Sequence, residues 1–247
     1  MTTIDAVVFD TDGVLTDTAS VHAAAWKRMF DDELRARAER SGEPFRPFEA
    51  ADYLRYVDGK PRFDGVRSFL ASRGIELPEG RPDDPPDAET VAALGNRKNR
   101  EFLERVREDG VKPFPSSVEF VRKLREAGVR TAVVSASRNM RSVLDAAGIA
   151  ELFDVAVDGV DAARLGLPGK PDPALFLRAA AELGVEPADA AVVEDALAGV
   201  EAGRRGGFGL VIGVDRGGQA DALAARGADV VVADLGELPL ERVLDRP

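Results

Sequence analysis

Two carboxylates lie two residues apart near the start of the chain, directly after an apolar run. The run Ile4–Phe9 is followed by Asp10, Thr11, Asp12 and Gly13. Two acids so close together at the end of an apolar strand repel each other unless a cation lies between them. Gly13 allows the sharp turn that brings backbone amides close to an anion. We therefore expect this loop to bind charged groups of both signs.

A second acidic pair, Glu194 and Asp195, follows the apolar run Ala190–Val193. In an open parallel sheet, ligands bind outside the carboxyl ends of the strands, so the two acidic pairs are expected to meet at one crevice. Four acids in one crevice would repel strongly without a metal ion. Carboxylate oxygens are hard ligands, which favour Mg²⁺, an ion that also binds substrate phosphate. The pattern predicts a magnesium site.

Two further strand ends supply groups suited to an anion. Ser135 follows Thr131–Val134 and offers a hydroxyl and the amides of the next turn, while Lys170 lies between Gly169 and Pro171 and offers a point charge suited to phosphate. Acids, a metal, a serine and a lysine together are typical of phosphoryl transfer, in which positioning and charge neutralisation provide most of the catalysis.

The elements that must position these groups alternate regularly. Short runs rich in Val and Ile are separated by helix-like stretches, a pattern that indicates an α/β fold with a doubly wound parallel sheet covered on both faces. The expected strands are Ile4–Phe9, Thr131–Ser135, Asp154–Val157, Ala190–Val193, Leu210–Val214 and Asp229–Val232. The expected helices between them are Ser117–Ala127, Asn139–Ala147, Pro173–Leu183, Leu197–Arg205 and Gln219–Arg226.

The segment 18–112 does not follow this alternation. It contains the helix-like stretches Val21–Ala38, Gly65–Ser72 and Glu89–Glu108, and its residues 77–87, rich in Pro and acidic groups, indicate an exposed loop. We therefore predict an α/β core domain made of residues 1–17 and 113–247, with an α-helical cap domain, residues 18–112, inserted into it.

The composition of the chain argues against several classes of protein. The chain has 247 residues, with 33 Lys and Arg against 44 Asp and Glu, so its net charge is −11. This charge argues against nucleic acid or an anionic membrane as the main partner. The chain has no Cys, no apolar run of membrane-spanning length and no signal-peptide pattern at its start. We expect a cytoplasmic protein with a small-molecule substrate; the oligomeric state is left open, with a monomer favoured.

The motifs together carry a resemblance to a known family. The run Asp10-Thr11-Asp12-Gly13-Val14-Leu15-Thr16 resembles the first motif of the haloacid dehalogenase-like phosphatases. Ser135, Lys170 and the pair Glu194-Asp195 are similar to the second, third and fourth motifs, in the same order. The helical insert directly after the first motif is similar to the subclass with an α-helical cap.

The resemblance implies a role for each motif residue. Asp10 would be the nucleophile that forms an aspartyl-phosphate, and Asp12 would be the general acid and base. Ser135 and Lys170 would bind the transferring phosphoryl group. Mg²⁺ would be held by Asp10, the Asp12 backbone carbonyl and, directly or through water, the pair Glu194 and Asp195.

A closer resemblance is to the β-phosphoglucomutase-like subfamily. It rests on Thr16-Asp17-Thr18, His22, Trp26 and Lys27, on Gly59 and Arg62, on Arg97-Lys98-Asn99, and on the run Ser135–Asn139. The resemblance implies that Arg62, Ser137 and Asn139 bind the second, non-reacting phosphate of the substrate. It also implies that Thr18, His22 and Lys98 couple cap closure to the placement of Asp12.

Two enzymatic functions and one non-enzymatic one follow from these residues. The first is a Mg²⁺-dependent phosphotransferase acting on a small phosphorylated sugar, interconverting β-glucose 1-phosphate and glucose 6-phosphate through the 1,6-bisphosphate. The alternative is a phosphatase of the same fold that hydrolyses a small sugar-phosphate ester. A non-catalytic phosphoacceptor module would also use clustered Asp, Ser and Lys, but such modules are about half this length and lack the insert.

Overall fold

The computed structural model describes residues 4–58 and 60–244. The chain divides into two compact units, one made of residues 1–17 and 111–247 and the other of residues 18–110. Each unit has its own buried apolar side chains. Gly59, part of the resemblance noted above, lies outside the described residues.

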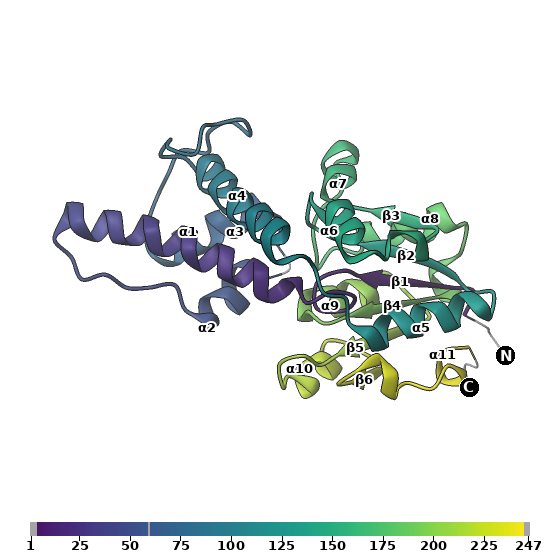
Figure 1. Cartoon of the computed structure of the whole chain (residues 1–247). Coiled ribbons are helices and arrows are strands. Elements are labelled where there is room, and N and C mark those ends of the chain that lie inside the picture. Colours follow the sequence, from purple (N-terminus) through teal and green to yellow (C-terminus); the bar gives the residue numbers. More distant parts are fainter. Residues whose placement is uncertain (1–3, 59, 245–247) are drawn as a thin grey trace. The chain divides into compact units, whose positions relative to one another are not determined.

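The first unit is built on a six-stranded sheet in the order β3-β2-β1-β4-β5-β6 (Figure 1). Every neighbouring pair of strands is parallel. The strands are β1 (Ala6–Asp10), β2 (Arg130–Val134), β3 (Val155–Val157), β4 (Ala190–Glu194), β5 (Leu210–Val214) and β6 (Val230–Val232). Because β1 is central, its carboxyl end lies between those of β2 and β4, where the polar motif residues follow.

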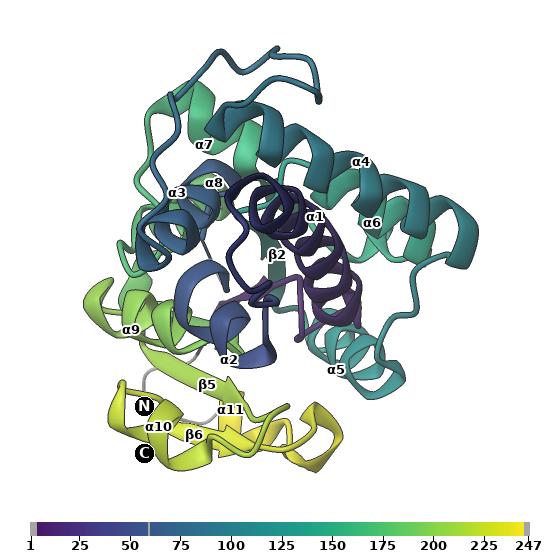
Figure 2. The same ribbon diagram turned by 90° about the vertical axis from the view of Figure 1, so that its left-hand side faces the viewer.

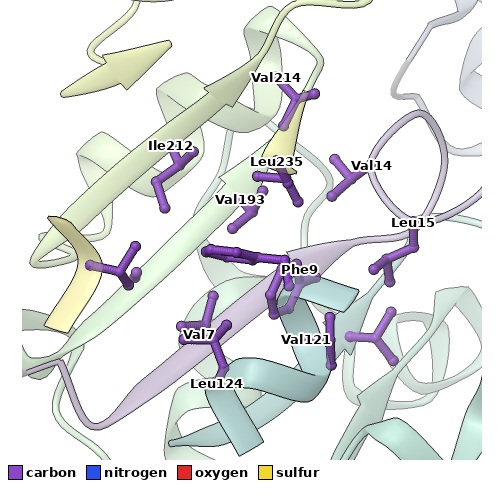
Figure 3. Close-up of a cluster of buried hydrophobic side chains, with 14 of the residues drawn as sticks. Val7, Phe9, Val14, Leu15, Val121, Leu124, Val193, Ile212, Val214 and Leu235 are labelled. Carbon is purple, nitrogen blue, oxygen red and sulfur yellow. The ribbon is translucent and has the colours of Figure 1, made fainter. Parts of the chain in front are cut away.

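Both faces of this sheet are buried. Side chains alternate along β1, so Val7 and Phe9 join one apolar cluster while Ala6 and Val8 join the other. Figure 3 shows Phe9 and its neighbours in the first cluster, among them Val121 and Leu124 from a covering helix. The strands are continuous apolar runs because each must bury both faces. The expected doubly wound α/β fold is confirmed.

Helices lie over each face of the sheet. One face is covered by α5 (Pro115–Glu126), α6 (Met140–Ala147) and α11 (Glu241–Leu244). The other is covered by α8 (Ala174–Leu183), α9 (Leu197–Arg205) and α10 (Ala220–Ala225). Figure 2 shows α10 beside β5 and β6, which it contacts. The short 3₁₀ turns are Ala150–Leu152, Pro187–Asp189 and Leu235–Glu237.

Two helices of this unit were not expected from the sequence: the four-residue α11 and the longer α7. Helix α7 (Gly159–Leu165) follows β3, and the side chain of Asp158 caps it by accepting hydrogen bonds from the backbone N–H groups of Val160 and Asp161, at 2.7 and 3.0 Å. The helix has only seven residues, too few to show a helical repeat of apolar side chains. The capping box formed by Asp158 and Asp161 is the signal that could have revealed it.

Every regular element in the described part of the second unit is a helix, and residues 73–90 form a long loop. Its elements are α1 (Thr18–Ser41), α2 (Ala50–Asp52), a π-helical turn at Tyr53–Val57, α3 (Arg62–Ser72) and α4 (Val91–Asp109). Helix α4 packs against α1 and α3 around an aromatic core that includes Trp26, Phe30 and Phe69. Thr90 caps α4, since its hydroxyl accepts a hydrogen bond from the Ala93 N–H at 3.1 Å. Among the described helices of either unit, none combines the length and apolarity needed to cross a membrane.

Candidate active site

The candidate site lies at the carboxyl end of the central strand. Asp10 is the last residue of β1 and pairs with Val134 of β2, so Ser135 follows directly beside it. On the other side, Phe9 pairs with Val193 of β4, and Glu194 comes next. The strand register therefore places an acid on β1, a hydroxyl after β2 and an acid on β4 side by side.

Hydrogen bonds hold the loop after β1 in a defined turn. The N–H of Asp12 donates to Oδ2 of Asp10 at 3.0 Å, and the hydroxyl of Thr11 donates to the carbonyl of Val134 at 3.0 Å. Gly13 has a φ of 80°, a left-handed conformation that glycine adopts without steric cost. The Asp10 carboxylate is thereby oriented by its own loop.

Lys170 lies between two of the acids. Its Nζ is 2.5 Å from Oδ1 of Asp10, and it also donates to Oε1 of Glu194. The side chains of Lys170, Asp10 and Glu194 are only 4%, 9% and 1% exposed, so the cluster is withdrawn from water. Burial in turn increases the strength of every charge interaction within it.

Burial and the neighbouring charges together shift the pKa values of Asp10 and Lys170. Burial raises the pKa of Asp10; the Lys170 ammonium lowers it, Glu194 and Asp12 raise it further, and the pKa comes to about 8. Burial lowers the pKa of Lys170, but Asp10 and Glu194 raise that pKa by more, so the ammonium stays charged. The described groups thus hold more negative charge than Lys170 alone can stabilise.

A divalent cation would offset this excess of negative charge. Asp10, Glu194 and Asp195 each present a carboxylate oxygen, and these oxygens lie within 4.8 Å of one another. The donors are all hard oxygens, the type that Mg²⁺ and Ca²⁺ prefer. Glu194 is oriented by the N–H of Ala196, which donates to its Oε2 at 2.6 Å. The side chain of Asp12 lies outside this trio, and its Oδ2 accepts from the Ser135 hydroxyl at 3.4 Å.

Two glycines leave room for the carboxylates. A Cβ on Gly13 would lie 1.9 Å from Oδ2 of Asp195, and a Cβ on Gly199 would lie 1.8 Å from Oε1 of Glu194. Gly199 lies inside α9, where glycine is about 1 kcal/mol less favourable than alanine. Gly199 was not predicted from the sequence, although a glycine within a helix is itself a signal of close packing.

The loop after β2 places the other residues expected to bind phosphate. The N–H of Ser137 donates to the Ser135 hydroxyl at 3.0 Å, and the N–H of Asn139 donates to the Ser137 hydroxyl at 3.2 Å. Asn139 then precedes the first residue of α6. Ser135, Ser137 and Asn139 therefore belong to one ordered turn in the first unit.

The remaining expected residues lie in the second unit. Thr18 and His22 are on α1, Arg62 is the first residue of α3, and Lys98 is on α4. The structure brings two of them together, because Nζ of Lys98 contacts Nδ1 of His22. The His22 ring stacks on Phe102 at 4.0 Å between centroids. Lys98 is 4% exposed, which is unusual for a lysine on a helix.

Two residues that touch the site were not selected from the sequence. Arg216 donates from Nε to the carbonyl of Gly13 at 2.9 Å, and Gln219 donates from Nε2 to the carbonyl of Asp195 at 3.4 Å. Both lie just after β5, at the same edge of the sheet as the motifs. The strand-end rule that located the other residues applies equally to this loop.

Comparisons with known proteins show which family the chain resembles. The family model of haloacid dehalogenase-like hydrolases matches residues 4–207. A β-phosphoglucomutase of Mycobacterium bovis is 55% identical over 239 residues, 95% of this chain and 91% of that protein. A β-phosphoglucomutase of Bacillus subtilis is 33% identical over 96% of this chain and 92% of its own. The crystal structure of a Clostridium difficile β-phosphoglucomutase, 24% identical, has a TM-score of 0.78 and covers 97% of this chain and 95% of its own.

The parallel sheet, with acids at its strand ends and a lysine from the segment between α7 and α8, defines an enzyme of phosphoryl transfer, a phosphotransferase or a phosphatase. The chain belongs to the haloacid dehalogenase-like hydrolase family, in its β-phosphoglucomutase-like subfamily.

Proposed function

We propose that this enzyme is a Mg²⁺-dependent phosphotransferase that interconverts β-glucose 1-phosphate and glucose 6-phosphate through the 1,6-bisphosphate. The observation that carries the proposal is the buried group formed by Asp10, Lys170 and Glu194, with Asp195 beside it. The sugar comes from the similarity to curated β-phosphoglucomutases, at 55% identity over most of the chain.

In the proposed reaction, Asp10 is the nucleophile. Its Oδ attacks the phosphorus of the bisphosphate, a new O–P bond forms, and the bond from phosphorus to the sugar oxygen breaks. Asp12 gives its proton to that leaving oxygen. In the return step, Asp12 takes the proton from a sugar hydroxyl, whose oxygen attacks the aspartyl-phosphate and regenerates Asp10.

The geometry supports these two roles. The N–H of Asp12 donates to Oδ2 of Asp10, so one loop holds both groups. Asp12 is also the less buried of the two, so its carboxylate is accessible to a substrate oxygen. A carboxylate two residues beyond the nucleophile can reach the same substrate oxygen that the nucleophile displaces.

Charge neutralisation is assigned to Lys170, Ser135 and the metal. Lys170 holds the nucleophile by its Oδ1 and would neutralise charge on the phosphoryl group, while the Ser135 hydroxyl would donate to a phosphoryl oxygen. Asp10, Glu194, Asp195 and the backbone carbonyl of Asp12 would hold Mg²⁺. When bound, Mg²⁺ would offset the negative charge of the carboxylates and of the phosphate.

The helical unit, residues 18–110, would act as a cap. Arg62, together with Ser137 and Asn139, would bind the phosphate that does not react. An arginine suits this role because its planar guanidinium can bind two phosphate oxygens at once. Thr18, His22 and Lys98 would link cap closure to the placement of Asp12. The contact between His22 and Lys98 shows that two helices of this unit already join these side chains.

The test is a coupled assay that follows glucose 6-phosphate made from β-glucose 1-phosphate, with Mg²⁺ and a trace of the 1,6-bisphosphate. The same enzyme is then given small phosphate esters, and released phosphate is measured. Transfer that exceeds hydrolysis supports the proposal. Hydrolysis without any glucose 6-phosphate would mean that the enzyme is a sugar phosphatase.

Arg62 provides a second test of the same choice. We expect Arg62→Ala to lower kcat/KM for the mutase reaction by about 10²-fold, of order 3 kcal/mol, and to change hydrolysis of a small ester much less. Arg62→Lys should restore part of the loss, because it keeps the charge without the planar fork. Arg100→Ala is the matched control, since Arg100 is exposed on α4. Equal losses in both reactions would exclude a role of Arg62 in binding the second phosphate.

A further inference from the structure

The loop between β5 and α10 is rigidly built and lies against the candidate site. The carboxylate of Asp215 accepts hydrogen bonds from the backbone N–H groups of Gly217, Gln219 and Ala220, at 3.1, 2.8 and 3.1 Å. The Gln219 N–H and the other backbone donors hold the pKa of Asp215 below its usual value. The loop therefore presents Arg216 from a fixed backbone.

The guanidinium of Arg216 is held on several sides. It stacks over the ring of Phe114 at 3.8 Å, and its Nη1 lies 3.3 Å from the carbonyl of Ala233 and 3.5 Å from Oδ2 of Asp234. Asp234 is itself fixed, because the Ser116 hydroxyl donates to its Oδ2 at 2.7 Å. With its planar group clamped in this way, Arg216 has little freedom to move away from its remaining partner.

That remaining partner is the loop that carries the nucleophile. Nε of Arg216 donates to the carbonyl of Gly13 at 2.9 Å, across 203 residues of sequence. The Cα of Gly13 faces the carboxylate of Asp195 so closely that no side chain would fit between them. From the same β5–α10 loop, Gln219 donates to the backbone carbonyl of Asp195. The β5–α10 loop thus contacts both Gly13 and Asp195, and the close packing of these two residues holds the acids after β1 and β4 near each other.

One donor of the Arg216 guanidinium is buried without a partner in the described part of the chain, which is unfavourable for stability. The side chain of Arg216 is 24% exposed, yet its Nη2 is buried and has no hydrogen-bond partner among the described residues. A buried donor without a partner is unfavourable, and such groups in folded proteins call for a reason. A smaller apolar side chain would cover Phe114 without burying this donor. The contact with Gly13 supplies the reason.

We propose that Arg216 is a positioning residue for phosphoryl transfer: by holding the Gly13 carbonyl it sets the distance between the Asp10–Asp12 loop and Asp195. This inference rests on the proposed chemistry of that site. Loss of the bond would let the loop move away from Asp195. The acids would then hold Mg²⁺ less tightly and Asp12 would lose its alignment, while the residues that bind the sugar phosphate would remain in place.

The test compares Arg216→Ala and Arg216→Lys with wild type and with Arg226→Ala. Arg226 is the matched control, an arginine one helix further on whose exposed side chain pairs with Glu201 on the surface. Three quantities are measured for each protein: the Mg²⁺ dissociation constant by calorimetry, kcat and KM for the sugar phosphate, and the thermal midpoint. Asp10→Asn is included to show that any turnover depends on the site.

For Arg216→Ala we expect a fall in kcat of about 10²-fold, Mg²⁺ binding about tenfold weaker, and a KM within about threefold of wild type. Arg216→Lys should remain at least about tenfold below wild type in kcat, because it restores the charge but neither the stacked plane nor Nε. Arg226→Ala should match wild type throughout.

Some results would overturn the inference. Unchanged Mg²⁺ affinity in Arg216→Ala would reduce Arg216 to a stabilising residue, and full recovery in Arg216→Lys would mean that only its charge matters. The calorimetric measurement of Mg²⁺ affinity does not depend on the identity of the sugar. It therefore tests the role of Arg216 even if the wild-type enzyme does not turn over glucose phosphates. That failure would count against the proposed function alone.

Discussion

Replacing Gly13 with alanine would have two energetic costs, and the same replacement at Gly128 allows them to be measured separately. The first is backbone strain, because Gly13 has a φ of 80°, where an L-residue is disfavoured by about 1–2 kcal/mol. The second is a collision, because the new Cβ would lie 1.9 Å from Oδ2 of Asp195 and 2.5 Å from its Cγ. Ordinary contact begins near 3.4 Å, so the loop and the carboxylate must separate by about 1.5 Å.

Gly128 isolates the first cost. It has a φ of 82°, nearly the same as Gly13, but a Cβ there would meet nothing within 4 Å. Gly128→Ala should therefore lose about 1–2 kcal/mol in the free energy of unfolding and keep its activity. Gly13→Ala should lose at least as much stability and, in addition, about 10²-fold or more in kcat/KM, since a 1 Å displacement of reacting groups costs about that factor.

The assays are urea denaturation of both variants, kcat/KM in the coupled mutase assay, and Mg²⁺ affinity by calorimetry. The variants should be compared at a temperature at which both are folded. If Gly13→Ala retains the activity and the Mg²⁺ affinity of Gly128→Ala, the close packing of Gly13 on Asp195 has no functional role and the reasoning is refuted.

Four more outcomes are expected. Gly199→Ala should lower kcat by about 10²-fold despite its higher helix propensity, since its Cβ would displace the Glu194 carboxylate; wild-type kcat with raised stability would contradict this. Asp10→Asn should abolish turnover yet shift the thermal midpoint by no more than about 4 °C, because burial raises the pKa of Asp10 to about 8 and thus disfavours its charged form. Excess EDTA should stop turnover and Mg²⁺ alone should restore it; full activity after extensive dialysis against EDTA would exclude the metal. Burial raises the pKa of Glu33, but hydrogen bonds from Arg97 and Arg37 lower it by more, so the net pKa lies below the ordinary value of 4.5. Glu33→Gln should then cost about 2 kcal/mol in unfolding free energy at pH 7 and progressively less as pH falls below about 4.5, with exposed Glu39→Gln as the control in urea titrations.

The sequence predicted most of the sheet and its site because both follow from local rules. Continuous apolar runs located all six strands to within two residues at each end. Parallel strands bring their carboxyl ends to one edge, so acids following β1 and β4 had to meet there. Asp10 and Glu194 were selected for this reason, and the structure places both in contact with Lys170. Lys170 itself was expected at a strand end and instead lies between α7 and α8.

Other features depend on contacts between residues that are distant in the sequence. The bond from Arg216 to Gly13 joins residues 203 positions apart, on the loops that follow β5 and β1. The clearance that Gly199 leaves for Glu194 becomes visible only when the carboxylate direction is known. Helix α7 was missed for a different reason, since its seven residues are too few for periodicity.

The chain leaves the sheet-bearing unit and returns to it at nearly the same place. The N–H of Asp17 donates to the carbonyl of Lys112 at 3.2 Å, and Thr16 forms a bridge with Pro113. Every described strand, and each of Asp10, Lys170, Glu194 and Asp195, lies outside the intervening segment 18–110. Insertions, deletions or exchange of that segment would leave the strand order and the acidic cluster encoded elsewhere. A change confined to the insert would therefore alter the residues proposed to act from the cap without altering the sequence of the sheet or of the acidic cluster.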